Sequence, residues 1–263
     1  MVKRVYLISK DIFLFCLNEK WLYGFLILAL LFVSIVNIPF WLKDLEPFKE
    51  MPPEKNALQV GLFFINVFLV LISVFLSVIG LSHFLSSERI SLILSKPVRR
   101  SEYILGIISG LYFVLLLNWF ILVSTLFFIL FLHTKYMDLS IYLGMLPSVL
   151  LSFICIGLVI FFYTIIPNFL SGILSLFVLL SGFGLTLEDI KKSEHLFLGR
   201  LIRLGAIFLP KVNSLFGISF DMLEIFEVRV NKLSTILHTV IFIFVLNLIS
   251  VYRFKRSYTL LVK

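Results

Sequence analysis

Long apolar runs, separated by shorter polar segments, set the pattern of this chain. The runs extend over roughly 20 to 30 residues and lack the amphipathic alternation of a soluble helix. A helix that rises about 1.5 Å per residue needs about 20 apolar residues to cross the hydrocarbon of a bilayer. The pattern predicts an all-α, polytopic membrane protein with a single domain, residues 1–263, and six transmembrane helices at 21–40, 58–81, 103–132, 139–166, 169–187 and 233–252.

The fourth and fifth predicted spans are separated by a proline. Residues 139–187 contain no charged residue, and as one helix they would be more than twice as long as the hydrocarbon is thick. Proline ends a helix because it lacks a backbone N–H and restricts the residue before it. We therefore expect the chain to turn at Pro167-Asn168, with a very short connection between the two spans.

Two segments outside the spans also have helical character. Residues 1–20 place several apolar side chains mostly on one side of a helix, with lysines available to lipid headgroups; the apolar residues are Val5, Ile8, Ile12, Phe13 and Phe15. This indicates an amphipathic helix on the inner membrane surface, and a disordered tail is the alternative. Residues 188–232 contain a half-apolar stretch, 196–220, broken at Pro210. Short interfacial helices fit this stretch better than a seventh crossing, which would bury Arg200 and Arg203.

Composition and charge support a membrane location and predict an orientation. The chain is 60% hydrophobic and only 14% charged, with mean hydropathy +1.10 and net charge +8. Residues 1–20, 83–103 and 253–263 together carry twelve Lys and Arg against four acids, and the other side carries eleven of each. When the Lys and Arg of the long 188–232 loop are left out of this count, the positive-inside rule predicts that both termini are cytoplasmic. We expect a prokaryotic inner membrane protein whose bases meet anionic lipid and not nucleic acid.

The sequence carries no pattern typical of an enzyme. The four histidines lack metal-site spacing, no Gly-Lys-Ser/Thr phosphate loop is present, and no acid falls inside a predicted span. We therefore expect no catalytic, cofactor-binding or metal-binding residues in this chain. Cys16 and Cys155 lie in apolar surroundings without a disulfide framework, so we interpret both as small packing residues.

Small and polar residues repeat on one face of two predicted spans. On the second span Asn66, Ser73 and Ser77 share a face with Gly80, and on the fourth span a similar series runs from Gly144 to Cys155. Two interpretations stay open. Such residues allow close helix packing, or they line a translocation cavity.

The segment between the second and third spans is the most informative. An apolar patch, Ile90 with Leu92, Ile93 and Leu94, precedes a basic stretch that ends before the third span. Apolar side chains on a short loop need a surface that buries them. The membrane surface and a partner protein are the two candidates.

This segment resembles the signature of type-2 ABC transporter permeases. Seven residues match it in order, Ser95, Lys96, Pro97, Val98, Arg100, Glu102 and Gly106, although the usual Gly-Thr is missing near Glu88 and the usual Lys is Ile107. The 188–232 loop is similar to the outer helical hairpin of the family's simpler exporters, such as the permease for nitrous-oxide-reductase maturation.

The resemblance implies a function and a set of residues. It implies an exporter subunit without enzymatic activity of its own, paired as a homodimer with a second permease chain. Two copies of a separate ATPase would bind ATP and magnesium and dock on a coupling helix at 83–102. The coupling residues would be Glu88, Arg89, Ile90, Leu92, Ile93, Leu94, Lys96, Pro97, Arg99, Arg100 and Glu102. A cavity between spans one, two and five would be lined by Ser34, Asn37, Asn66, Ser73, Ser77, Ser171 and Ser175. Residues 188–232 could hold a periplasmic or extracellular partner. The alternative function is a non-transporting membrane scaffold or sensor.

Overall fold

The computed structural model describes residues 2–38, 52–86, 98–135, 139–166, 169–184, 211–225 and 231–257. Within these ranges all regular structure is helical and there is no strand. The helices are α1 (Val2–Asn18), α2 (Lys20–Val33) with the 3-10 turn η1 (Ser34–Asn37), α5 (Pro53–Phe84), α7 (Arg100–Thr134), α8 (Ser140–Gly144), α9 (Leu146–Tyr163), α10 (Leu170–Gly184), α13 (Val212–Met222) and α14 (Lys232–Ser257). The all-α prediction is confirmed.

Among the described residues, five helical segments are long and apolar enough to cross a membrane: Lys20–Asn37, Pro53–Phe84, Arg100–Thr134, Ser140–Tyr163 and Lys232–Arg256. They are consistent with a multi-pass membrane protein. The fifth predicted span, 169–187, coincides with α10, whose 15 residues extend about 22 Å, less than the roughly 30 Å of hydrocarbon. A sixth crossing therefore stays a prediction. Helix α9 ends at Tyr163 and α10 begins at Leu170, on the two sides of the predicted break, whose residues Pro167 and Asn168 lie outside the described residues.

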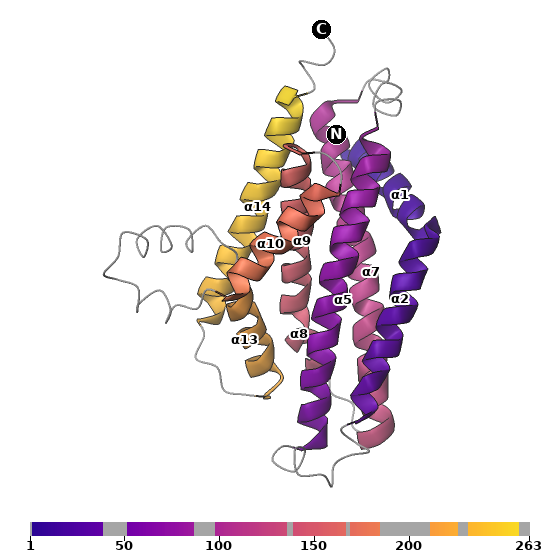
Figure 1. Cartoon of the computed structure of the whole chain (residues 1–263), viewed down its shortest axis with the longest axis vertical. Coiled ribbons are helices and arrows are strands. Elements are labelled where there is room, and N and C mark those ends of the chain that lie inside the picture. The colour runs from indigo at the N-terminus through magenta and orange to yellow at the C-terminus, as the bar shows by residue number, and fades with distance from the viewer. Residues whose placement is uncertain are drawn as a thin grey trace, which may run out of the picture.

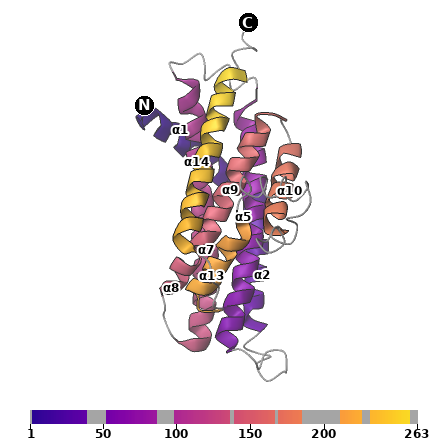
Figure 2. The same ribbon diagram turned by 90° about the vertical axis from the view of Figure 1, so that its left-hand side faces the viewer.

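The helices form an elongated bundle (Figure 1). Its centre is α9, which packs against α5, α7, α10, α13 and α14. In the second view α1 and α10 lie on opposite sides of the bundle (Figure 2). The N-terminal end of α1, the adjoining ends of α5 and α7, and the C-terminal end of α14 lie toward one end, and we call this the loop end.

Helix α1 is the helix predicted over residues 1–20, but its apolar side faces protein. Ile8 and Ile12 contact α7 at two glycines: a Cβ added at Gly106 would lie 2.5 Å from Ile8 Cγ2, and one added at Gly110 would lie 2.8 Å from Ile12 Cβ. The two backbones can approach this closely only because glycine has no side chain. Part of the predicted apolar side therefore packs against α7, and the location of α1 on the inner membrane surface stays a prediction.

The predicted fourth span, 139–166, is interrupted at Met145. Pro147 follows the break at the start of α9, where its missing N–H and its ring prevent a continuous α-helix with the preceding turn. The carbonyl oxygen of Met145 accepts a hydrogen bond from the backbone N–H of Ser148 at 3.1 Å and a second one from Trp119 Nε1 of α7 at 3.2 Å. The Trp119 side chain thus adds a hydrogen bond that connects α7 to α9 at the break.

This bond leads to a matched prediction. Trp119→Phe should lower the free energy of unfolding by about 0.5 to 1.5 kcal/mol more than Trp21→Phe. The reason is that Trp21 Nε1 is buried without a hydrogen-bond partner within the described ranges. Trp21→Phe therefore removes packing contacts but no hydrogen bond. Thermal unfolding of both variants in detergent measures the difference. Equal losses would show that the bond at Met145 contributes nothing.

The segment predicted as an outer helical hairpin, 188–232, is only partly within the described ranges. Its helix α13 begins just after Pro210, as the predicted break implies, and buries Val212, Leu215 and Ile218. Lys232 at the start of α14 forms an ion pair with Asp221 of α13. The remainder of the hairpin prediction lies outside the described residues.

Candidate functional site

A buried hydrogen bond connects the ends of α5 and α7 that flank the loop between them. The hydroxyl of Tyr103, near the start of α7, donates a hydrogen bond to the carbonyl oxygen of Phe84, the last residue of α5, at 2.7 Å. Tyr103 is 2% exposed and Phe84 is 6% exposed. A buried hydrogen bond of this kind fixes the two helix ends relative to each other. The two helix ends that flank the loop are therefore held together.

A buried carboxylate organises the α7 side of this contact. Glu102 is 3% exposed, and its Oε2 accepts a hydrogen bond from the backbone N–H of Arg99 at 3.2 Å. Glu102 also pairs with Arg4 of α1, with 3.7 Å between Oε2 and Nη1. The first turn of a helix favours an acidic side chain because its unpaired N–H groups carry partial positive charge. Glu102 thus caps α7 and connects it to α1.

Helix α1 joins these helix ends through aromatic contacts. The ring of Phe15 stacks on His83 of α5 with centroids 3.9 Å apart, and it meets Phe84 edge-on at 5.0 Å. Three helices, α1, α5 and α7, therefore converge where the loop leaves the bundle. We call this cluster, Arg4, Phe15, His83, Phe84, Glu102 and Tyr103, the loop base.

Only part of the predicted coupling segment can be placed. Arg99 precedes α7 and Arg100 is its first residue. Arg100 Nη1 is buried and has no hydrogen-bond partner among the described residues. Glu102 lies in the loop base. The other predicted coupling residues lie outside the described residues: Glu88, Arg89, Ile90, Leu92, Ile93, Leu94, Lys96 and Pro97.

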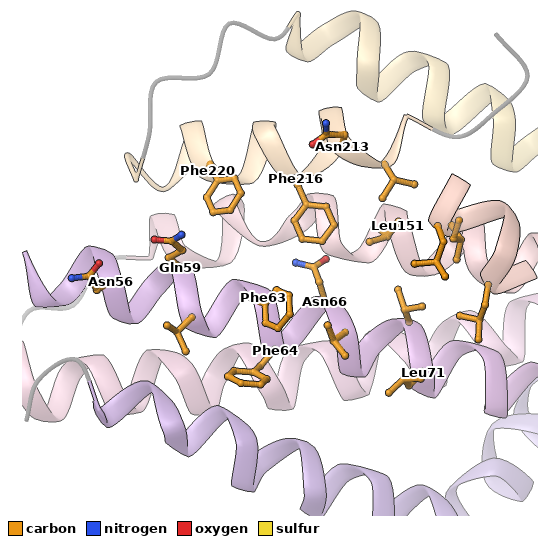
Figure 3. A pocket seen from close by; sticks show the side chains of 17 residues that line it. Asn56, Gln59, Phe63, Phe64, Asn66, Leu71, Leu151, Asn213, Phe216 and Phe220 are labelled. Atoms are coloured by element: carbon orange, nitrogen blue, oxygen red, sulfur yellow. The ribbon is translucent and has the colours of Figure 1, made fainter. Parts of the chain in front are cut away.

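A cavity of about 780 Å³ lies between α5, α9, α10 and α13. Its size falls within the usual range of ligand pockets, about 300 to 1,000 Å³. Among the described residues that line it, apolar side chains dominate, together with four amides and no charged residue, as Figure 3 shows for the labelled residues. The amides are Asn56, Gln59, Asn66 and Asn213, and the rings are Phe63, Phe64, Phe216 and Phe220.

Of the seven predicted cavity residues, Asn66 lines this cavity. It points toward α13, near Phe216 (Figure 3), and its amide nitrogen donates to the Leu62 carbonyl of its own helix at 2.8 Å. Ser73 and Ser77 lie on the same helix but are fully buried, and their hydroxyls donate to the carbonyl oxygens of Leu69 and Ser73. These two serines belong to packed helix surfaces.

The remaining predicted cavity residues lie in other surroundings. Ser171 and Ser175 of α10 are fully buried, beside Gly172, where an added Cβ would lie 2.9 Å from Val74 of α5. Small residues thus bring α10 close to α5. Ser34 and Asn37 lie in η1, and Asn37 Oδ1 is 2.8 Å from His133 Nε2 near the end of α7.

Sequence reasoning missed the contribution of α13 to the cavity. Asn213, Phe216 and Phe220 come from the segment interpreted as an interfacial loop, and no predicted residue of span one lines the cavity. The available signal was the pair Phe216 and Phe220, four positions apart in the segment that follows Pro210. That spacing marks one face of a helix but does not say which surface the face covers.

Helix α5 connects the two parts of the site. It contributes nine cavity residues between Asn56 and Leu71, and it ends at Phe84 in the loop base. It is a single α-helix of 32 residues without an internal proline. Because a straight helix moves as a rigid element, a tilt at one end displaces the other. No protein-family model matches this chain, and no curated protein is significantly similar to it.

Proposed function

We propose that this chain is the membrane-spanning permease subunit of an ATP-binding-cassette exporter. The observation that carries the proposal is the pairing of the Ser95 to Gly106 signature with a tied loop base on a helix that also lines a cavity. A second permease chain completes a homodimer, and two copies of a separate ATPase supply the energy of ATP hydrolysis. Both termini and the loop end face the cytoplasm of a prokaryotic cell in this proposal.

The mechanism follows from the connection between loop and cavity. An ATPase that binds residues 83–102 moves the ends of α5 and α7 together, because the hydrogen bond between Tyr103 and Phe84 connects these ends. The shared motion tilts α5 as a unit and changes the wall from Asn56 to Leu71. The binding energy of ATP thereby changes the shape of a cavity that is far from the nucleotide.

The cavity wall favours a cargo without fixed charge in its bound part. Burying an unpaired ion in an apolar wall costs several kcal/mol or more, whereas amides can donate and accept hydrogen bonds with neutral polar groups. The four amides beside four phenylalanine rings suit an amphipathic, lipid-linked or peptide cargo. Recovery of a ligand with a fixed charge bound inside this cavity would contradict this cargo class.

Capture of an ATPase subunit tests the proposal. The chain is co-expressed with candidate ATPases, and ATPase retained on the purified chain is measured. Ile93→Asp and Arg100→Glu should each reduce retention about tenfold or more, because an interface depends on a few central side chains. Lys255→Glu is the matched control, since it reverses a charge at the same end of the bundle but on α14, outside residues 83–102.

Each outcome distinguishes the two functions. Selective loss of ATPase with unchanged size-exclusion behaviour supports the transporter. Equal retention in all three variants contradicts a coupling role for residues 83–102. Absence of any ATPase partner favours the scaffold or sensor, and ATP hydrolysis by the isolated chain excludes the permease assignment.

A further inference from the structure

A second hollow lies between α1 and α7, away from the cavity described above. It has a volume of about 610 Å³ and is lined by Tyr6, Ser9, Lys10, Phe13, Leu14, Phe113, Leu116 and Leu117. We call it the α1–α7 groove. Its size is within the usual range for ligand sites, and all its residues lie on two helices that pack closely against each other.

The groove exposes large apolar side chains on both walls. Tyr6 is 62% exposed on α1, and Phe113 is 56% exposed on α7. Exposed apolar side chains on neighbouring helices form a patch that calls for a covering group. In a protein with several apolar, membrane-length helices, lipid acyl chains are the solvent of such a surface.

One charged residue, Lys10, lines the groove. It is exposed, and a lysine can lay its methylene stem along apolar walls while its ammonium group reaches the polar boundary. The neighbouring base on α1, Arg4, is already paired with Glu102. Helix α1 carries three bases, Lys3, Arg4 and Lys10, against Asp11, which gives it a charge of +2. The groove therefore combines apolar walls with a cationic side chain.

The walls are held in place by the contact beside them. Gly106 and Gly110 fix α7 against Ile8 and Ile12 of α1, and Ser9, which lines the groove, is 5% exposed. A preformed site loses less conformational entropy on binding than a mobile one. The groove is thus preformed by the packing of α1 against α7.

We propose that the α1–α7 groove binds one anionic phospholipid, with an acyl chain along Phe13, Leu14, Phe113 and Leu117 and the headgroup phosphate at Lys10. Basic pockets between membrane helices favour anionic headgroups for this electrostatic reason. The lipid covers the outer side of α1 and completes its contact with α7. This inference does not depend on the proposed transport function, because it needs only a bilayer around the bundle.

Native mass spectrometry of the full chain tests the site. The protein in mild detergent is equilibrated with phosphatidylglycerol or with phosphatidylcholine of the same acyl chains, and bound lipid is counted. Wild type should retain phosphatidylglycerol preferentially, and Lys10→Gln should reduce that preference about fivefold. Lys3→Gln is the matched control, because Lys3 lies on the same helix but does not line the groove. Leu117→Trp, which fills the groove, should lower retention of both lipids.

The alternatives give different patterns. Equal retention of the two lipids by wild type overturns the proposal, and so does an equal effect of Lys3→Gln and Lys10→Gln, which indicates general surface charge. Thermal unfolding gives a second measurement if Leu117→Trp does not fold. Added phosphatidylglycerol should raise the Tm of wild type more than that of Lys10→Gln, and an equal rise in both also overturns the proposal.

Discussion

Replacing Gly110 with leucine should release α1 from α7 and lower the free energy of unfolding by about 3 kcal/mol. Even a Cβ at this position would lie 2.8 Å from Ile12 Cβ and 2.9 Å from the backbone oxygen of Ser9. A flexible side chain could turn away, but a backbone oxygen moves only if the whole helix moves. The gain of about 1 kcal/mol in helix propensity over glycine is too small to offset this clash.

The thiol of Cys16 reports the release directly. Cys16 lies on α1 and is 1% exposed, and burial raises its pKa to about 12, with the Glu19 carboxylate adding to the rise. The thiolate is the reactive form, so maleimide labelling at pH 8 should be slow while α1 is docked. Release should restore an ordinary thiol pKa and increase the labelling rate about tenfold or more. Cys155→Ser in all samples leaves Cys16 as the sole thiol of the chain.

Gly24→Leu is the matched control for this experiment. An added Cβ at Gly24 meets nothing within 4 Å, so this variant gains the same helix propensity without a clash. It should leave both the Tm and the Cys16 labelling rate near the wild-type values. If Gly110→Leu labels as slowly as Gly24→Leu, close contact at Gly110 does not hold α1 in place.

Substitutions of Glu102 should separate its capping role from its charge. Glu102→Ala removes the acceptor of the Arg99 N–H and the partner of Arg4, and we expect a loss of about 2 kcal/mol in the free energy of unfolding. Glu102→Gln keeps an acceptor for the cap and removes only the charge. Its loss should stay below about 1 kcal/mol, because Arg4 is half exposed and solvent screens such pairs.

The ion pair alone is tested with Arg4→Ala. This variant keeps the cap but leaves the buried Glu102 carboxylate without its partner, so its loss should exceed that of Glu102→Gln, which leaves only the half-exposed Arg4 unpaired. The double variant Arg4→Ala with Glu102→Gln should cost little more than Glu102→Gln alone, as expected for a shared interaction. A loss for Arg4→Ala as large as that for Glu102→Ala would show that the ion pair, and not the cap, holds the loop base together. If the proposed function is correct, Glu102→Ala should also weaken the effect of ATP hydrolysis on transport.

Local patterns predicted a large part of the fold. The apolar runs predicted the bounds of α5, α7 and α14 to within about five residues, because the length and hydropathy of a membrane-length helix are properties of its own segment. Pro167 predicted a turn for an equally local reason. The break at Met145 was missed although Pro147 stands in the sequence, because a proline near a helix start is also tolerated without a break.

The sequence by itself determined which segments are helical, where prolines interrupt them, and which loop carries the charged signature. Only the tertiary structure decided what each face meets. The apolar side of α1 was expected to face lipid, and the two glycines of α7 bring part of it, at Ile8 and Ile12, against protein. Ser73 and Ser77 could line a cavity, but their hydroxyls bond to their own helix inside the bundle. The face of α13 completes the cavity wall instead. The physical reason is the same in each case: helix formation depends on neighbours in the chain, whereas burial depends on the shapes of surfaces that meet from distant parts of it.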